Sequence, residues 1–241
     1  MTFAVFDIET RVDKDLLNRT FFPHDNIEDD EAFRRFAENL RNGFFPPSLH
    51  IPISIAIGDV GENYLLRSVE SLALADYSEE KLAREFWNRI ERFKGWLVSF
   101  NGRRFDLPVL ELAALRFGIP APGYFTDYDS PRSPEGRHLD LLEFLTNRGA
   151  VSLRGGMNLL LKMIGMPGKM GIDGSRVQGL YEAGRLDDIH RYCRCDVVQT
   201  YFLFLRIELM RGRIDPAIYA DARAAAEHFM AEFGALPAAG A

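Results

Sequence analysis

The chain has 241 residues, of which 47% are hydrophobic and 27% are charged, and its formal net charge is −6 at pH 7. This composition is typical of a globular protein and excludes the disordered, fibrous and membrane-spanning classes. The acidic balance argues against a protein that coats long duplexes, because such proteins are usually strongly basic. It leaves room for a nuclease, whose metal site concentrates carboxylates.

Cysteine usage and targeting features indicate the compartment. Cys193 and Cys195 lie two residues apart on an expected helix, so they point to different faces and cannot readily form a disulfide. We interpret both as inert packing residues in a reducing environment. No apolar run approaches the length that spans a bilayer, and residues 1–10 lack the features of a signal peptide. We therefore expect a cytoplasmic protein that contacts no membrane.

The first part of the chain predicts a central strand, an excursion and a hairpin. Residues 2–8 are rich in apolar β-branched and aromatic side chains, which is typical of a buried strand. Residues 11–50 are charged, include a helix-like stretch near 28–40, and resemble an insertion before the sheet resumes. The apolar runs 53–58 and 63–67 flank a turn-rich joint and predict an antiparallel hairpin.

From Ser78 onwards, helical and strand patterns alternate, and Ser78 itself is suited to cap the helix that follows. The predicted elements are helix 79–94, strand 96–100, helix 106–117, strand 138–141, helix 157–164 and helix 186–209. A hairpin followed by such alternation indicates an α/β fold, with a mixed sheet flanked by helices. We expect one domain over residues 1–212, in which 11–50 is an insertion, and a helical, Ala-rich extension over residues 213–241.

The first candidate site is a pair of carboxylates in the first predicted strand. Asp7 and Glu9 are two residues apart, so they project from the same face, and we place them at the strand's end. Two like charges this close raise each other's pKa unless a cation or hydrogen bonds compensate them. A divalent metal is the functional interpretation, and a solvated pair is the commoner case when such residues are considered alone.

Two further segments carry acidic residues. Asp106 follows a short Gly-containing loop and begins a predicted helix, where capping of that helix is the alternative interpretation. Tyr192 and Asp196 are four residues apart on the long predicted helix and therefore share a face. A surface pair is the alternative, but the apolar residues that follow Asp196 favour an inward-facing carboxylate.

Together these segments resemble the three motifs of the ribonuclease-H-like DEDD superfamily of 3′–5′ exonucleases. The motifs appear in order as Asp7-Ile8-Glu9, as Asn101 with Phe105-Asp106, and as Tyr192 with Asp196. Arg191 stands where the histidine branch carries its histidine, so the chain resembles the tyrosine (DEDDy) branch. The likeness is strongest to predicted free-standing bacterial exonucleases related to the exonuclease domain of family-B DNA polymerases.

This resemblance runs over residues 2–210 and includes segments outside the motifs. His138 and Asp140 belong to one of them, and we interpret them as a satisfied structural pair, with orientation of the site as the alternative. Lys169 belongs to another, a Gly- and Pro-rich loop, where a surface role is favoured over contact with a nucleic-acid backbone. Residues 11–50 depart from the polymerase exonuclease domains.

The resemblance implies two divalent cations. Asp7, Glu9 and Asp196 would hold one, and Asp7 would bridge to a second, on which Asp106 acts mainly through water. Hard oxygen ligands suit Mg²⁺ or Mn²⁺. Tyr192, with an unperturbed pKa near ~10, would orient the attacking water rather than act as a base.

The resemblance also implies substrate-binding residues. Thr10, beside the first motif, and Asn101 and Phe105 of the second are candidates for contact with the terminal sugar or base. For Phe105, packing in the core alone is an equal alternative. Arg103 is a candidate phosphate ligand, because a guanidinium matches that group, and a solvated loop residue is the favoured alternative.

The function expected from these residues is hydrolysis of single-stranded or frayed DNA 3′ ends, with release of nucleoside 5′-monophosphates. Trimming of RNA 3′ ends requires the same chemistry and stays an alternative. A nuclease-derived binding or scaffold module is a third hypothesis, which the intact acidic set disfavours.

Overall fold

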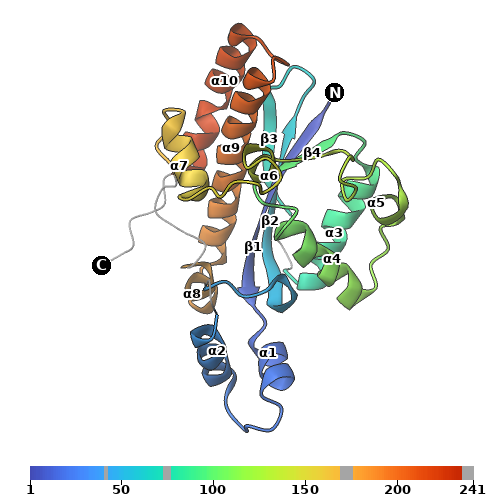
Figure 1. Cartoon of the computed structure of the whole chain (residues 1–241), viewed down its shortest axis with the longest axis vertical. Coiled ribbons are helices and arrows are strands. Elements are labelled where there is room, and N and C mark those ends of the chain that lie inside the picture. Colours follow the sequence, from blue (N-terminus) through green and yellow to red (C-terminus); the bar gives the residue numbers. More distant parts are fainter. Residues whose placement is uncertain (41–42, 73–76, 169–175, 235–241) are drawn as a thin grey trace.

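The computed structural model of this chain describes residues 1–40, 43–72, 77–168 and 176–234, and it has a mixed sheet with helices on both faces (Figure 1). The strands are β1 (Phe3–Val12), β2 (His50–Val60), β3 (Leu66–Ser71), β4 (Trp96–Ser99) and β5 (His138–Asp140). The helices of the first half are α1 (Lys14–Phe21), α2 (Asp29–Glu38), the 3₁₀ helix η1 (Pro47–Leu49), α3 (Glu79–Arg92), α4 (Asp106–Phe117) and α5 (Pro122–Thr126). Those of the second half are α6 (Leu141–Leu145), α7 (Gly156–Met163), α8 (Val177–Glu182), α9 (Leu186–Met210) and α10 (Pro216–Gly234).

The sheet has the strand order β3-β2-β1-β4-β5. The first three strands in the chain pair antiparallel, β1 with β2 and β2 with β3, whereas β4 pairs parallel with β1 and with β5. This arrangement confirms the predicted α/β fold with a mixed sheet, and it makes β1 the central strand.

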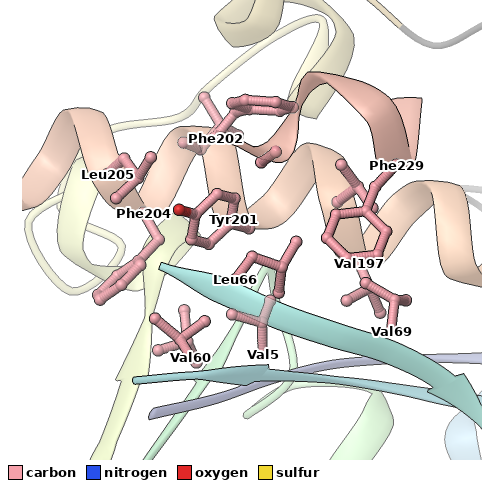
Figure 2. Close-up of a cluster of buried hydrophobic side chains, with 14 of the residues drawn as sticks. Val5, Val60, Leu66, Val69, Val197, Tyr201, Phe202, Phe204, Leu205 and Phe229 are labelled. Atoms are coloured by element: carbon pink, nitrogen blue, oxygen red, sulfur yellow. The ribbon is translucent and has the colours of Figure 1, made fainter. Parts of the chain in front are cut away.

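Alternation along β1 divides the core into two layers. Phe3 and Val5 face the cluster built on α9, and Phe6 and Ile8 face the cluster built on α3 and α4. Figure 2 shows the first layer, in which apolar side chains of α9 lie over the strands. Phe204 is fully buried there, with its ring centroid 4.8 Å from that of Phe3. The same alternation directs Asp7 and Glu9 towards α9.

The predicted insertion forms a small helical unit beyond the end of β1 (Figure 1). It contains α1, α2 and η1, of which only α2 was predicted. A separate cluster of buried side chains holds it together, namely Val12, Leu17, Ala32 and Leu49. The insertion therefore packs around its own core and joins the sheet through the ends of β1 and β2.

Several boundaries differ from the predictions. β1 continues to Val12 rather than ending near Ile8, because its pairing with β2 extends to His50. β3 starts at Leu66, three residues later than expected. The predicted start and end of α4 are confirmed, as is the Ser78 cap, whose side chain accepts the N–H of Lys81.

The Ala-rich segment after α9 forms α10, which packs on α9. Ala222, Ala226 and Phe229 belong to the same buried cluster as α9, and the boundary at residue 212 stays a prediction. Within the described ranges, no helix is both long and apolar enough to cross a membrane.

The α9 layer yields a stability prediction. Phe204→Ala should lower the free energy of unfolding by about 3–5 kcal/mol, because it leaves a cavity in a fully buried cluster. Leu115→Ala, at a side chain 79% exposed, should change it by less than about 0.5 kcal/mol. Urea unfolding followed by circular dichroism measures both, and similar small effects would contradict the packing described.

Candidate active site

The acidic pair lies where β1 loses one of its two neighbours. The pairing of β1 with β4 extends only to Val5, whereas the pairing with β2 continues past Glu9. Asp7 and Glu9 are therefore inside β1 and not at its end, which corrects the prediction. They nevertheless lie beyond the end of the parallel part of the sheet, where the free edge of β1 is open to other groups.

α9 brings the third carboxylate to this pair. Tyr192 and Asp196 lie on the face of α9 that turns towards β1, and both are buried. One carboxylate oxygen from each of Asp7, Glu9 and Asp196 lies within 4.8 Å of the others. Among the described residues, this is the only such group of three or more acidic, histidine or cysteine side chains. Three of the four predicted metal-binding residues, Asp7, Glu9 and Asp196, thus converge and form what we call the carboxylate cluster.

Asp106 occupies the free edge of β1. Its Oδ1 accepts the backbone N–H of Ile8 at 3.2 Å, so the carboxylate takes a position that a strand would otherwise fill. It is the first residue of α4 and not its cap, which is Phe105. Burial, together with the negative charges of Asp140 and Asp196, raises the pKa of Asp106 to about 7. Asp106 therefore lies next to the carboxylate cluster, although it is not one of its three residues.

The carboxylate cluster is suited to bind a divalent cation. Like charges at this separation repel one another strongly in a partly buried site, and a cation between them would offset that cost. The donors are hard oxygen atoms, and Glu9 and Asp196 are almost fully enclosed, with exposed fractions of 8% and 3%. This donor set suits Mg²⁺ or Mn²⁺ better than metals that prefer sulfur or nitrogen.

Tyr192 is held as a neutral phenol. Burial is the main cause that raises its pKa far above the usual value for tyrosine, and the charges of Asp196, Glu9 and Asp7 add to it. Its hydroxyl interacts with Asp196 by a side-chain hydrogen bond. Tyr192 can therefore donate a hydrogen bond at neutral pH, and it cannot serve as a base there.

Cys193 does more than the predicted inert packing. Its thiol donates to the backbone carbonyl of Asp7 at 3.3 Å, and its sulfur lies 3.7 Å from the Asp7 carboxylate. The thiol thus ties α9 to the acidic segment of β1. Neither Cys193 nor Cys195 forms a disulfide, and both are buried.

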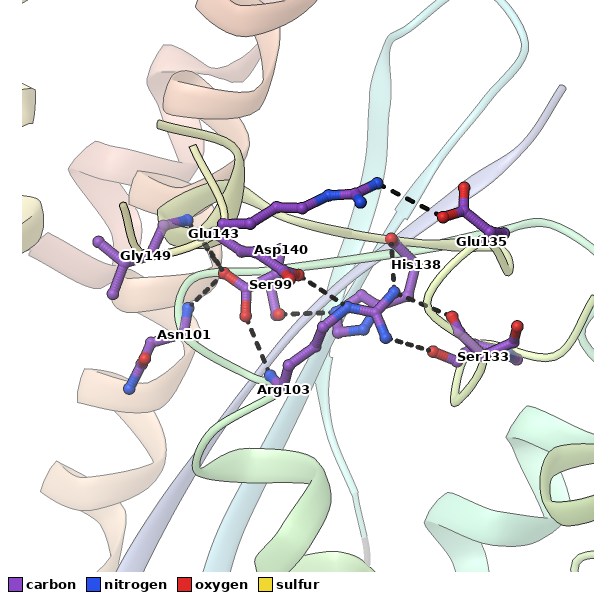
Figure 3. Close-up of polar contacts among 12 residues, drawn as sticks. Ser99, Asn101, Arg103, Ser133, Glu135, His138, Asp140, Glu143 and Gly149 are labelled. Carbon is purple, nitrogen blue, oxygen red and sulfur yellow. Dashed lines mark hydrogen bonds and ion pairs between the residues drawn. The ribbon is translucent and has the colours of Figure 1, made fainter. Parts of the chain in front are cut away.

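Asp140 fixes the loop of the second motif (Figure 3). Its Oδ1 accepts the N–H of Asn101 and its Oδ2 that of Arg103, each at 3.0 Å. Oδ1 also accepts two N–H groups at the start of α6. Asn101 has a φ of 71°, a left-handed conformation that costs a non-glycine residue on the order of 1–3 kcal/mol. Asp140 therefore positions the backbone that leads to Asp106, a role that the sequence offered only as the alternative.

The Arg103 side chain is held by contacts within the protein. Its guanidinium donates to the carbonyls of Pro131, Ser133 and His138 and forms an ion pair with Glu143 at 3.1 Å (Figure 3). The prediction of a solvated loop residue is wrong, because these contacts hold the side chain against the 131–138 loop. They also leave the predicted phosphate contact without structural support.

Two of the three remaining substrate candidates, Thr10 and Phe105, contact His50, a residue that the sequence did not single out. The hydroxyl oxygen of Thr10 lies 2.8 Å from His50 Nδ1, and the ring of Phe105 meets the His50 ring edge-on at 4.9 Å. Asn101 contributes its backbone to the Asp140 contacts, and the role of its side chain stays a prediction. Lys169 lies outside the described residues. No motif points to His50, which lies 40 residues from Thr10.

A comparison with protein families gives the decisive match. Residues 42–236 match the family described as a predicted 3′–5′ exonuclease related to the exonuclease domain of PolB. The chain belongs to this family. The matched residues include Asp106, Tyr192 and Asp196 but begin after Asp7 and Glu9. The first acidic pair is therefore linked to the site by its geometry and not by the family match.

A solved DNA polymerase structure shares the fold of this chain. The family B DNA polymerase from the hyperthermophilic archaeon Pyrobaculum calidifontis matches with a TM-score of 0.55 and 13% identity, over 87% of this chain and 24% of the polymerase. E. coli exonuclease I in complex with a dT13 oligonucleotide matches with a TM-score of 0.47 and 14% identity, over 88% of this chain and 42% of that protein. The chain thus spans less than half the length of either. No curated protein sequence matches it.

His138 generates a prediction for the dependence of stability on pH. Its Nε2 lies 2.8 Å from the Ser99 hydroxyl oxygen, and burial together with the charge of Arg103 lowers its pKa from 6.5 to about 3. Between these values the unfolded chain binds a proton that the folded protein does not, so stability falls on acidification. From pH 7 to pH 5 this histidine should cost about 2 kcal/mol.

Urea unfolding at pH 7 and pH 5 checks this value. His138→Gln should lose about 2 kcal/mol less than the wild type over this interval. His24→Gln, at an exposed histidine, is the matched control and should behave as the wild type. An unchanged pH dependence in His138→Gln would show that this ring is not held neutral by burial.

Proposed function

We propose that this chain is a two-metal 3′–5′ exonuclease that acts on single-stranded or frayed DNA 3′ ends and releases nucleoside 5′-monophosphates. The observation that carries the proposal is the convergence of Asp7, Glu9 and Asp196 within 4.8 Å, beside Asp106, in a chain of this exonuclease family. Membership of this family gives the class of enzyme, and the carboxylate cluster offers a chemical means of phosphodiester hydrolysis.

Each carboxylate has a role in holding metal. Asp7, Glu9 and Asp196 would bind one divalent ion, and Asp106, with Asp7, would serve a second. When bound, two Mg²⁺ or Mn²⁺ ions supply an activated hydroxide and stabilise the leaving 3′ oxygen. The buried position of Asp196 and Glu9 limits the access of bulk water to these ligands.

Tyr192 would orient the water that attacks the terminal phosphate. Its hydroxyl keeps its proton at neutral pH and lies beside Asp196. It can therefore donate a hydrogen bond to a water molecule next to the carboxylate cluster and so align that water. The tyrosine in place of a histidine assigns the chain to the tyrosine branch in this proposal. Tyr192 itself would not remove the proton from that water.

The substrate proposal rests on charge and family. The family is related to the exonuclease domain of a DNA polymerase, which favours DNA. A net charge of −6 disfavours binding along a duplex, which requires many phosphate contacts, and suits recognition of a short single-stranded end. RNA trimming requires the same residues and is tested as a separate arm of the assay. A binding module without turnover would conserve the fold and fail in that assay.

Digestion of a 5′-labelled DNA oligonucleotide in Mg²⁺ or Mn²⁺ tests the proposal. The wild type should shorten the strand progressively from its 3′ end and leave circular single-stranded DNA intact. Asp196→Asn should abolish cleavage because it removes a metal ligand. Tyr192→Phe should lower kcat by about 100-fold, because the water loses its alignment. Asp187→Asn, an exposed change on the same helix, should be active.

A matched RNA oligonucleotide in the same assay distinguishes the substrates, because only RNA offers the 2′-hydroxyl. Faster digestion of RNA than of DNA would make RNA the proposed substrate. Internal cleavage of the circle, or equal activity of wild type and Asp196→Asn, would contradict it. Circular dichroism of each variant establishes that the fold is intact.

A further inference from the structure

His50, the first residue of β2, joins the insertion to both acidic segments. Its Nδ1 lies 2.8 Å from Thr10 Oγ1, its Nε2 lies 3.3 Å from the carbonyl oxygen of Phe45, and its ring packs edge-on against Phe105. Thr10 directly follows Glu9, and Phe105 directly precedes Asp106. One side chain thus contacts the neighbours of two site carboxylates and the end of the insertion.

The partners of the ring define its protonation. A carbonyl oxygen can only accept, so Nε2 must carry a proton to bond with Phe45. In a neutral imidazole Nδ1 is then the acceptor, and the Thr10 hydroxyl donates to it. Burial lowers the pKa of His50, which agrees with the neutral form. The orientation of the Thr10 hydroxyl is therefore set by the bond between the insertion and His50.

The surface that these residues form is open to a ligand. Thr10, His50, Phe45 and Phe105 are all partly exposed, unlike the enclosed carboxylates Glu9 and Asp196. The neighbouring Phe44 is 78% exposed. Aromatic rings with a polar group beside them are the usual means of holding a single-stranded base.

We propose that His50 is a positioning residue for the terminal nucleotide. It holds Thr10 and Phe105 as the surface against which that nucleotide packs, and through Phe45 it makes the insertion part of the same subsite. This inference rests on the proposed exonuclease function and adds a role for residues 11–50. Since these groups border the carboxylates and are not among them, they act on binding of the DNA end more than on hydrolysis.

Thr10→Val and two substitutions of His50 test the inference. Val is nearly isosteric with Thr but cannot donate to Nδ1. His50→Gln places an amide near the Nε2 position and can maintain the bond to Phe45, whereas His50→Asn places one near Nδ1 and can maintain the bond to Thr10. KM and kcat are measured on a short DNA oligonucleotide with Mg²⁺, and Kd is measured by fluorescence anisotropy with Ca²⁺ in place of Mg²⁺.

Thr10→Val and His50→Gln should raise KM and Kd by about 3- to 10-fold, the effect of one hydrogen bond, while kcat changes less than about threefold. His50→Asn should also raise both, because it releases the insertion. Thr10→Ser, which can still donate, should restore wild-type values. Thr126→Val, at an exposed hydroxyl bonded to Pro122 far from the site, is the matched control and should have no effect.

The outcomes distinguish this inference from the proposed function. A wild type that digests DNA while all three variants retain its KM and Kd overturns the inference alone, and so does a fall in kcat without a change in KM. A wild type that digests neither DNA nor RNA overturns the proposed function and the inference with it. Equal thermal melting of Thr10→Val and Thr10→Ser would show that the comparison reports on the hydroxyl and not on folding.

Discussion

The crowding of carboxylates beside the free edge of β1 is the constraint on which the rest of the site depends. Three of them have oxygen atoms within 4.8 Å of one another, and Asp106 lies next to them. Such a group is unfavourable in a folded protein without a cation, so the surrounding structure must hold it in place. Cys193 ties α9 to Asp7, and Asp140 fixes the loop before Asp106.

The early end of β4 makes this arrangement accessible. Past Val5, β1 pairs only with β2, and the edge that β4 leaves free receives the Asp106 carboxylate through the N–H of Ile8. The same end of β1 leads into the insertion, whose last residue contacts both acidic segments as His50. The chemistry, the loop that supports it and the proposed nucleotide surface thus share one place in the sheet.

Local patterns in the sequence were sufficient for the elements and the acidic residues. Spacing of two in a strand predicted a shared face for Asp7 and Glu9, and spacing of four in a helix did so for Tyr192 and Asp196. His50 was not found this way, and the role of Asp140 was only one of two alternatives, because each depends on contacts with residues about 40 positions away. Arg103 was misjudged for the same reason, since its partners belong to a loop that carries no pattern of its own.

Calorimetric titration of the metal-free protein with Mn²⁺ tests the central claim most directly. The wild type should bind the ion, and Asp7→Asn should bind it at least about 10-fold more weakly while melting at a higher temperature without metal, because one of the repelling charges is gone. Asp187→Asn should bind as the wild type does. Equal affinity for Mn²⁺ and equal stoichiometry in Asp7→Asn and the wild type would contradict the assignment of the carboxylate cluster as the metal site.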